Sequence, residues 1–109
     1  MIVPKAYVVN QVVVHDSQRY AEYAALGRSA VAQYGGRVLA GGGRVETLEG
    51  EPVPPRVVVI EFADFDTAVA YYRSPEYQAA KAVRGDAATV RFAVVDGLTL
   101  ELGVDGEPD

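Results

Sequence analysis

Two valine-rich segments constrain the fold of this chain most, because both are apolar on both faces. Alternate residues of a β-strand point to opposite faces of a sheet. In Lys5–Val14 and in Arg56–Phe62, valine occupies positions of both parities. Valine-rich runs are typical of strands, and strands that are apolar on both faces are normally covered on both sides. The two segments therefore predict central strands of a sheet that is buried on both faces.

A long amphipathic helix is predicted directly after the first strand. Asp16 suits the N-cap, and Gly35 suits the left-handed C′ residue that follows the last turn. Between them, apolar residues recur at a spacing of three or four. These residues are Tyr20, Tyr23, Ala24, Gly27, Val31 and Tyr34. Their stripe predicts a helix that packs on one face of the sheet.

The remaining elements are two further strands and two short helices. The expected strands are Arg37–Leu48, bent at its three glycines, and Thr89–Asp96. One helix is expected from Asp64 to Arg73, with Phe65, Ala68, Val69 and Tyr72 inward. The other is expected after the Ser74-Pro75 pair, with Tyr77, Ala80 and Val83 inward. A short fifth strand is expected over Leu98–Leu102, which makes residues 1–102 one domain, and residues 103–109 are expected to form a disordered tail.

The order β-α-β-β-α-β predicts a ferredoxin-like α+β fold with one antiparallel sheet. The first and third strands are expected at its centre, with both helical segments on one face. The chain supplies no helix for the other face, and its C-terminal tail is too polar to cover it. A second copy of the same sheet is the simplest cover, so the sequence predicts a homodimer.

Composition excludes several classes of function. The chain has no cysteine and a single histidine, which excludes thiolate chemistry and metal sites built on cysteine or several histidines. The formal net charge of −5 with scattered basic residues argues against nucleic-acid binding. No apolar run approaches the roughly 20 residues of a membrane span, and the N-terminus does not look like a signal peptide. We expect a cytoplasmic protein that needs neither a metal nor a cofactor.

Several short motifs together identify a family resemblance. They are Tyr34-Gly35-Gly36-Arg37, Gly42-Gly43, Leu48-Glu49-Gly50, Val58-Val59-Ile60-Glu61-Phe62 and Ser74-Pro75-Glu76-Tyr77. With these motifs the chain resembles the domain-of-unknown-function 1330 family, within the dimeric α+β barrel superfamily. The resemblance implies two ferredoxin-like subunits that pack sheet to sheet. It transfers architecture and no chemistry, because the family has no agreed activity. Family members often carry an arginine where this chain has Gly41.

The candidate ligand site lies between the sheet and the helices, and we expect Asn10, His15, Tyr23 and Arg56 to line it. Antiparallel pairing brings Arg56 towards His15, and the helix that starts at Asp16 carries Tyr23 over the same region. An apolar wall with a few polar groups is the usual composition of a ligand site. The alternative is a closed end, in which Arg56 neutralises Asp16, His15 faces solvent and Asn10 bonds to a backbone carbonyl or a water molecule.

Other polar residues of the strands have simpler interpretations. Glu61 is expected near Lys5 and Tyr7, in a cross-strand ion pair or as a buried carboxylate that acts as a base. Arg91 is expected to join Arg56 and His15 in a cationic cluster, which would hold a substrate carboxylate or neutralise Asp16. Gln11 and Asn10 are adjacent, so one is expected to face the helices and the other the partner subunit.

Two functions remain open at this point. One is a cofactor-independent enzyme that acts on a small organic metabolite, and the other is a non-catalytic small-molecule-binding or stress-associated dimer. RNA binding is disfavoured, because RNA-recognition domains need aromatic residues within basic strand motifs and the third strand here is Arg-Val-Val-Val-Ile-Glu-Phe. Haem-degrading relatives resemble one another in an Asn/Trp/His set, and this chain has no tryptophan.

Overall fold

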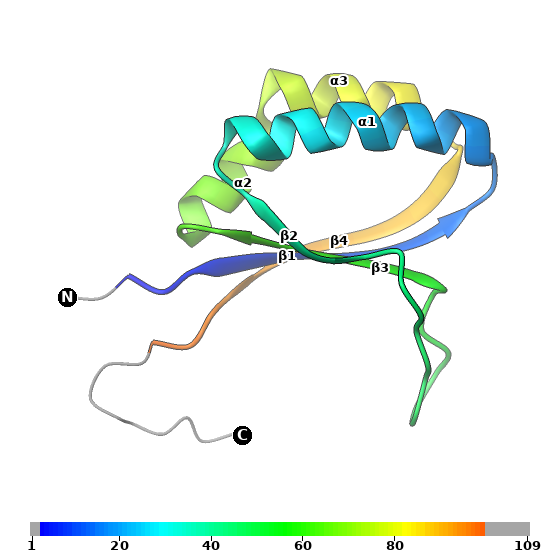
Figure 1. The fold of residues 1–109 in the computed structure, drawn as a ribbon, viewed down its shortest axis with the longest axis horizontal. Coiled ribbons are helices and arrows are strands. Elements are labelled where there is room, and N and C mark those ends of the chain that lie inside the picture. The colour runs from blue at the N-terminus through cyan, green and yellow to red at the C-terminus, as the bar shows by residue number, and fades with distance from the viewer. Residues whose placement is uncertain (1–2, 100–109) are drawn as a thin grey trace.

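The computed structural model describes residues 3–99. Four strands and three helices follow one another in the order β-α-β-β-α-α-β (Figure 1). Their bounds are β1 Ala6–Val14, α1 Ser17–Gln33, β2 Arg37–Gly41, β3 Arg56–Phe62, α2 Phe65–Arg73, α3 Pro75–Arg84 and β4 Ala88–Asp96. The order and the fold class are those predicted, with the second helical segment divided into α2 and α3.

The sheet is antiparallel, and its strand order is β2-β3-β1-β4. The two valine-rich strands β1 and β3 are therefore central, as predicted. Val8 of β1 pairs with Ile60 of β3, and Val9 pairs with Val59. All three helices lie on one side of the sheet, and α1 runs beside α3 (Figure 1). Within residues 3–99, helices therefore cover only one face of the sheet.

The second strand is shorter than predicted. It ends at Gly41 and not at Leu48, and Gly42 has a φ of 86°, which takes the backbone out of the extended conformation. Residues 42–55 contain no regular element and extend away from the sheet on the side opposite the helices (Figure 1). Residues 98 and 99 are not in a strand. The rest of the expected fifth strand and the expected tail, residues 103–109, lie outside the described residues.

Caps set the helix boundaries, as the sequence predicts. The carboxylate of Asp16 accepts a hydrogen bond from the backbone N–H of Arg19 at 3.1 Å. At the other end of α1, Gly35 has a φ of 71°. Its N–H donates to the carbonyl of Ala32, and the N–H of Gly36 donates to that of Val31. This pair of bonds is the Schellman motif, in which glycine avoids the cost of a left-handed side-chain-bearing residue.

The core lies between the helices and the sheet, and aromatic side chains fill much of it. Two inward-facing residues differ from those predicted. In α2 the deeply buried aromatic is Tyr71, while Tyr72 is half-buried and Phe65 is exposed. In α3 the buried residue of the last turn is Arg84, which is 7% exposed, and not Val83. None of the helices within residues 3–99 is long and apolar enough to cross a membrane.

Candidate functional site

A cleft opens between α1 and the part of the sheet formed by β1, β3 and β2. Its walls are mainly apolar and aromatic, with a few polar groups: Asn10, Tyr20, Tyr23, Ala24, Gly27, Arg28, Val31, Val38, Val58, Ile60 and Tyr71. The volume of the cleft that the centre of a water molecule can occupy is about 70 Å³. Because one water position takes about 10–15 Å³ on this measure, the cleft has room for a few waters or one small organic molecule.

Gly27 helps to keep the cleft open. It is buried in the interior of α1, where glycine costs about 1 kcal/mol relative to alanine. A Cβ atom built at this position would meet nothing within 4 Å in the described structure. Packing therefore does not require glycine here, and the space above it belongs to the cleft.

Asn10 lines the same cleft and carries an unsatisfied polar atom. It projects from the helix-facing side of β1 and is 4% exposed. Its Oδ1 has no hydrogen-bond partner among residues 3–99. A buried polar atom without a partner costs about 1–3 kcal/mol, so such atoms usually mark a bound water or a ligand. Gln11, the next residue, lies on the opposite face, as expected from strand alternation.

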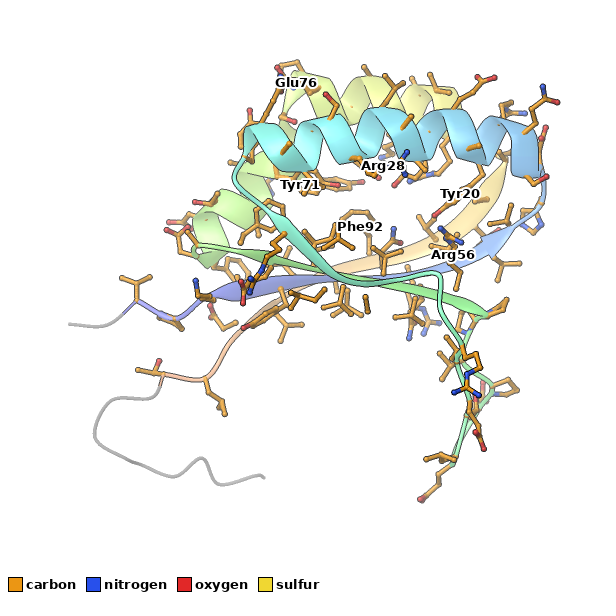
Figure 2. The ribbon with its side chains drawn as sticks, viewed as in Figure 1. Tyr20, Arg28, Arg56, Tyr71, Glu76 and Phe92 are labelled. Atoms are coloured by element: carbon orange, nitrogen blue, oxygen red, sulfur yellow. The ribbon has the colours of Figure 1, made fainter. Side chains whose placement is uncertain are left out.

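Tyr20 lines the cleft, and Tyr20 and Arg56 point towards each other (Figure 2). The Arg56 Nε donates to the Tyr20 hydroxyl oxygen at 3.2 Å, and the guanidinium carbon lies 5.2 Å from the centre of the Tyr20 ring. A Cβ at Gly42 would lie 3.0 Å from Arg56 Nη1. The glycine after β2 therefore leaves the space that the arginine occupies.

A second tyrosine–arginine group lies deeper, between α1 and α3. The hydroxyls of Tyr23 and Tyr77 are 2.8 Å apart, and Arg84 Nη1 donates to the Tyr77 hydroxyl at 3.0 Å. The Arg84 guanidinium also stacks 5.1 Å from the centre of the Tyr23 ring. Within residues 3–99, no carboxylate forms a salt bridge with Arg84. Two phenols and an aromatic face are the described partners of this buried cation.

Burial decides the protonation state of these phenols. Desolvation raises the pKa of Tyr23, and it raises those of Tyr71 and Tyr77 further. Burial disfavours the charged form of an acid, so all three hydroxyls stay protonated at neutral pH. They act as hydrogen-bond donors and acceptors, and not as bases.

The four residues predicted for the site do not all meet. Asn10 and Tyr23 line the cleft, and Arg56 reaches it through Tyr20. His15 is exposed, with its Nε2 2.8 Å from the Thr89 hydroxyl, and is not among the residues that line the cleft. Of the expected alternative, the contact between Arg56 and Asp16 does not form, because the described partner of Arg56 is Tyr20, whereas His15 does face solvent.

Sequence reasoning missed four residues that shape the cleft. Tyr20 and Gly27 were on the predicted apolar stripe of α1, but nothing in the sequence separated them from ordinary core residues. Tyr71 was assigned to the wrong side of α2. Arg84 follows Tyr77 and Ala80 at helical spacing, and that spacing was the available signal for its burial.

The other polar expectations also change partners. Glu61 forms its ion pair with Arg37 of β2, at 3.1 Å, and accepts a hydrogen bond from Tyr7 at 3.3 Å. The expected ion pair with Lys5 is absent from residues 3–99. Arg91 lies on the sheet face opposite Arg56, beside residues 51–54. The cationic cluster expected around His15 therefore does not form. No group of three or more metal-binding side chains gathers among residues 3–99.

Solved structures share this fold. A protein of unknown function from Rhodopseudomonas palustris matches with a TM-score of 0.69 and 21% identity, over 88% of this chain and 84% of that one. SnoaB, a cofactor-independent oxygenase from Streptomyces nogalater, matches with a TM-score of 0.55 and 16% identity, over 91% and 99%. A dimeric ferredoxin-like protein of unknown function from Jannaschia sp. matches with a TM-score of 0.57 and 16% identity, over 82% and 97%. At these identities the likeness establishes the fold alone.

Sequence comparison assigns the chain to a family. No functionally curated protein matches it significantly. A family model described as "Domain of unknown function (DUF1330)" matches residues 5–98, which include all the strands and helices and the whole lining of the cleft. The chain belongs to the DUF1330 family.

Proposed function

We propose that this protein is a cytoplasmic homodimer that binds a small organic molecule in the cleft of each subunit and acts on it as a cofactor-independent enzyme. The observation that carries the proposal is the unsatisfied Oδ1 of Asn10, a residue that lines the cleft that Gly27 keeps open. A ligand with an O–H or N–H group would satisfy Asn10, and the aromatic walls would hold its apolar part.

Catalysis in such a cleft would rest on hydrogen-bond donors. Tyr20 and Tyr23 line the cleft and carry hydroxyls, and Arg28 stands on the side of α1 that faces the sheet (Figure 2). Fixed donors in a site that excludes water stabilise negative charge that develops on a bound oxygen. The likeness to a cofactor-independent oxygenase supports the same proposal at the level of the fold.

The second candidate is a non-catalytic small-molecule-binding or stress-associated dimer. One observation favours it: the described residues that line the cleft include no aspartate, glutamate or histidine. The common general bases of enzymes are histidine and the carboxylates. Without one, a proton-transfer step would have to use the ligand's own groups or a bound water.

The dimer is supported by the surface that the chain leaves uncovered. Val9 of β1 and Val57 and Val59 of β3 project from the face without helices and are only half-buried. On the same side, the segment 42–55 extends away from the sheet (Figure 1) and carries Leu48, which is 86% exposed. A second copy would cover both features, and one structural neighbour is described as dimeric.

A variant that fills the cleft tests the ligand site. Gly27→Leu places a side chain into open space, so it should block the cleft without disturbing the core. Ala25→Leu adds the same side chain at an exposed position of the same helix and is the matched control. Ligand-observed NMR screening of a fragment library should give binders that wild type and Ala25→Leu share and that Gly27→Leu loses.

Two outcomes of this screen decide the proposal. Fragments that bind Gly27→Leu as well as wild type would place binding elsewhere and contradict the ligand site. If the cleft binds, incubation of its best ligands with the protein, followed by mass spectrometry, separates the two candidates. Conversion that Gly27→Leu abolishes supports the enzyme, and ligands that are bound but unchanged support the non-catalytic dimer.

A further inference from the structure

The hydrogen-bond direction at Tyr20 leaves its proton free for the cleft. A phenol oxygen accepts hydrogen bonds and donates its own proton. Arg56 Nε has no lone pair to offer, so Tyr20 is the acceptor in the 3.2 Å bond between them. Within the described part of the chain, no acceptor bonds to the Tyr20 proton. Tyr20 is 7% exposed and lines the cleft, so a cleft ligand is the natural acceptor for its proton.

The same logic extends to Tyr23 through one more hydroxyl. Arg84 is a cation and can only donate, so Tyr77 accepts its bond at 3.0 Å. A hydroxyl that accepts from a cation becomes a stronger donor, because hydrogen bonds in a chain polarise one another. The favoured direction of the 2.8 Å contact is therefore from Tyr77 to Tyr23. Tyr23, which also lines the cleft, is then left with its own proton unused.

The charge around the cleft has one sign. Arg28 lines it, Arg56 backs Tyr20 and Arg84 backs both Tyr77 and Tyr23. The described lining contains no carboxylate, although the whole chain has a formal net charge of −5. Three arginines with no salt bridge to any carboxylate in residues 3–99 surround the cleft. Such a potential favours a negatively charged ligand.

We propose that the ligand of the cleft is an organic anion, and that the hydroxyls of Tyr20 and Tyr23 together bind its oxyanion oxygen. Arg56 polarises the first hydroxyl directly, and Arg84 polarises the second through Tyr77. The ligand class is thus a small carboxylate, enolate or phenolate whose apolar part lies against the aromatic wall. This inference rests on the proposed function, because it requires that the cleft is the binding site.

Pairs of acids and their amides test the charge of the ligand. Acetate, benzoate and 4-hydroxybenzoate, each with its neutral amide, are titrated at pH 7 into wild type and variants labelled with ¹⁵N, and the amide signals of cleft residues are followed. We expect at least one acid to bind at the cleft about tenfold or more tightly than its amide. Tyr20→Phe and Tyr23→Phe should each weaken the acid about tenfold and leave the amide unchanged.

Tyr72→Phe is the matched control. The Tyr72 hydroxyl accepts a hydrogen bond from Lys81 Nζ at 3.1 Å and lies outside the cleft. This variant should therefore bind acids as wild type does. The unchanged amide affinity also shows that each variant is folded. An amide that binds as tightly as its acid, or acid binding that survives in both Tyr20→Phe and Tyr23→Phe, would overturn the anion inference and leave the ligand site standing. If no acid or amide shifts the cleft signals, the anion inference and the proposed function both fail.

Discussion

Both faces of the sheet carry valine on the two central strands, but the surroundings of these valines differ. On the helix-facing side, Val8 pairs with Ile60 beneath the helices and is 0% exposed. One residue along, on the other side, Val9 pairs with Val59, and both are only half-buried. Val13 and Val95 of the same face are exposed. Within residues 3–99, no helix covers these valines of the outer face.

We infer from the difference that each face binds something else. The helices do not close completely on the first face and leave a cleft lined by Asn10, whose Oδ1 is unsatisfied. Within residues 3–99 the second face has no helix above it (Figure 1), and Val9, Val57 and Val59 lie on its central strands. The first face therefore suits a small molecule, and the second suits a second copy of the protein.

Two neighbouring valines give the largest expected contrast. Val8→Glu buries a charge in the core and should cost about 4 kcal/mol or more, which leaves most of the protein unfolded. Val9→Glu places the same charge on the outer face, so the chain should keep its fold and lose its partner. Circular dichroism with urea titration measures the first effect, and light scattering measures the second. Equal unfolding of both variants, or a Val9→Glu variant that remains dimeric, would contradict the difference between the two faces.

Gly36→Ala tests how tightly the helix layer packs on its face. A Cβ there would lie 2.7 Å from a ring carbon of Phe62 and 2.9 Å from Val31 Cγ1. Overpacking of this kind costs about 1–3 kcal/mol, which a urea titration will detect. Gly43→Ala is the control, since a Cβ at Gly43 meets nothing within 4 Å in the described structure. Equal midpoints for the two variants would show that the layer is looser than the structure indicates.

Gly35→Val tests the turn that returns the chain from the helix layer to the sheet. The φ of 71° at Gly35 is unfavourable for a side-chain-bearing residue by about 1–2 kcal/mol. We expect a loss of that size in the free energy of unfolding. Gly35→Asn should lose less, because asparagine tolerates the left-handed region better. An unchanged melting temperature for Gly35→Val would mean that the turn has another conformation.

Gly27→Ala should have the smallest effect, and it should be stabilising. Alanine favours the helix over glycine by about 1 kcal/mol, and its Cβ meets nothing within 4 Å in the described structure. The urea midpoint should therefore rise while the cleft loses a little of its space. A fall in the midpoint would show that α1 lies closer to the sheet than described, which would weaken the case for a cleft.

Most of the fold follows from local patterns in the sequence. Valine at positions of both parities predicted that β1 and β3 are the central strands, and the caps at Asp16 and Gly35 predicted the ends of α1. The predicted end of β2 was wrong, because three consecutive glycines indicate a break without showing whether the strand resumes. The residues after Gly42 could have bent and continued, and the backbone at Gly42 instead turns away.

The site was less predictable than the fold, for two physical reasons. Asn10 and Tyr23 could be placed, because alternation and helical spacing determine where such side chains point. His15 could not, since it follows the end of β1, where alternation no longer applies, and its ring lies beside Thr89. Arg84 was missed because arginine is almost never fully buried unless it is paired, and its partners are two tyrosines, one of them Tyr23 of the distant helix α1, and no carboxylate.

The solution mass of the wild-type protein tests most directly the central claim that a second copy covers the outer face. Light scattering at micromolar concentration should give twice the mass of one chain, and Val9→Glu should give the mass of one chain with the circular dichroism spectrum unchanged. A wild-type protein that is monomeric at that concentration and has ordinary stability would contradict the claim, because the valine-rich outer face would then be stable in water without a partner.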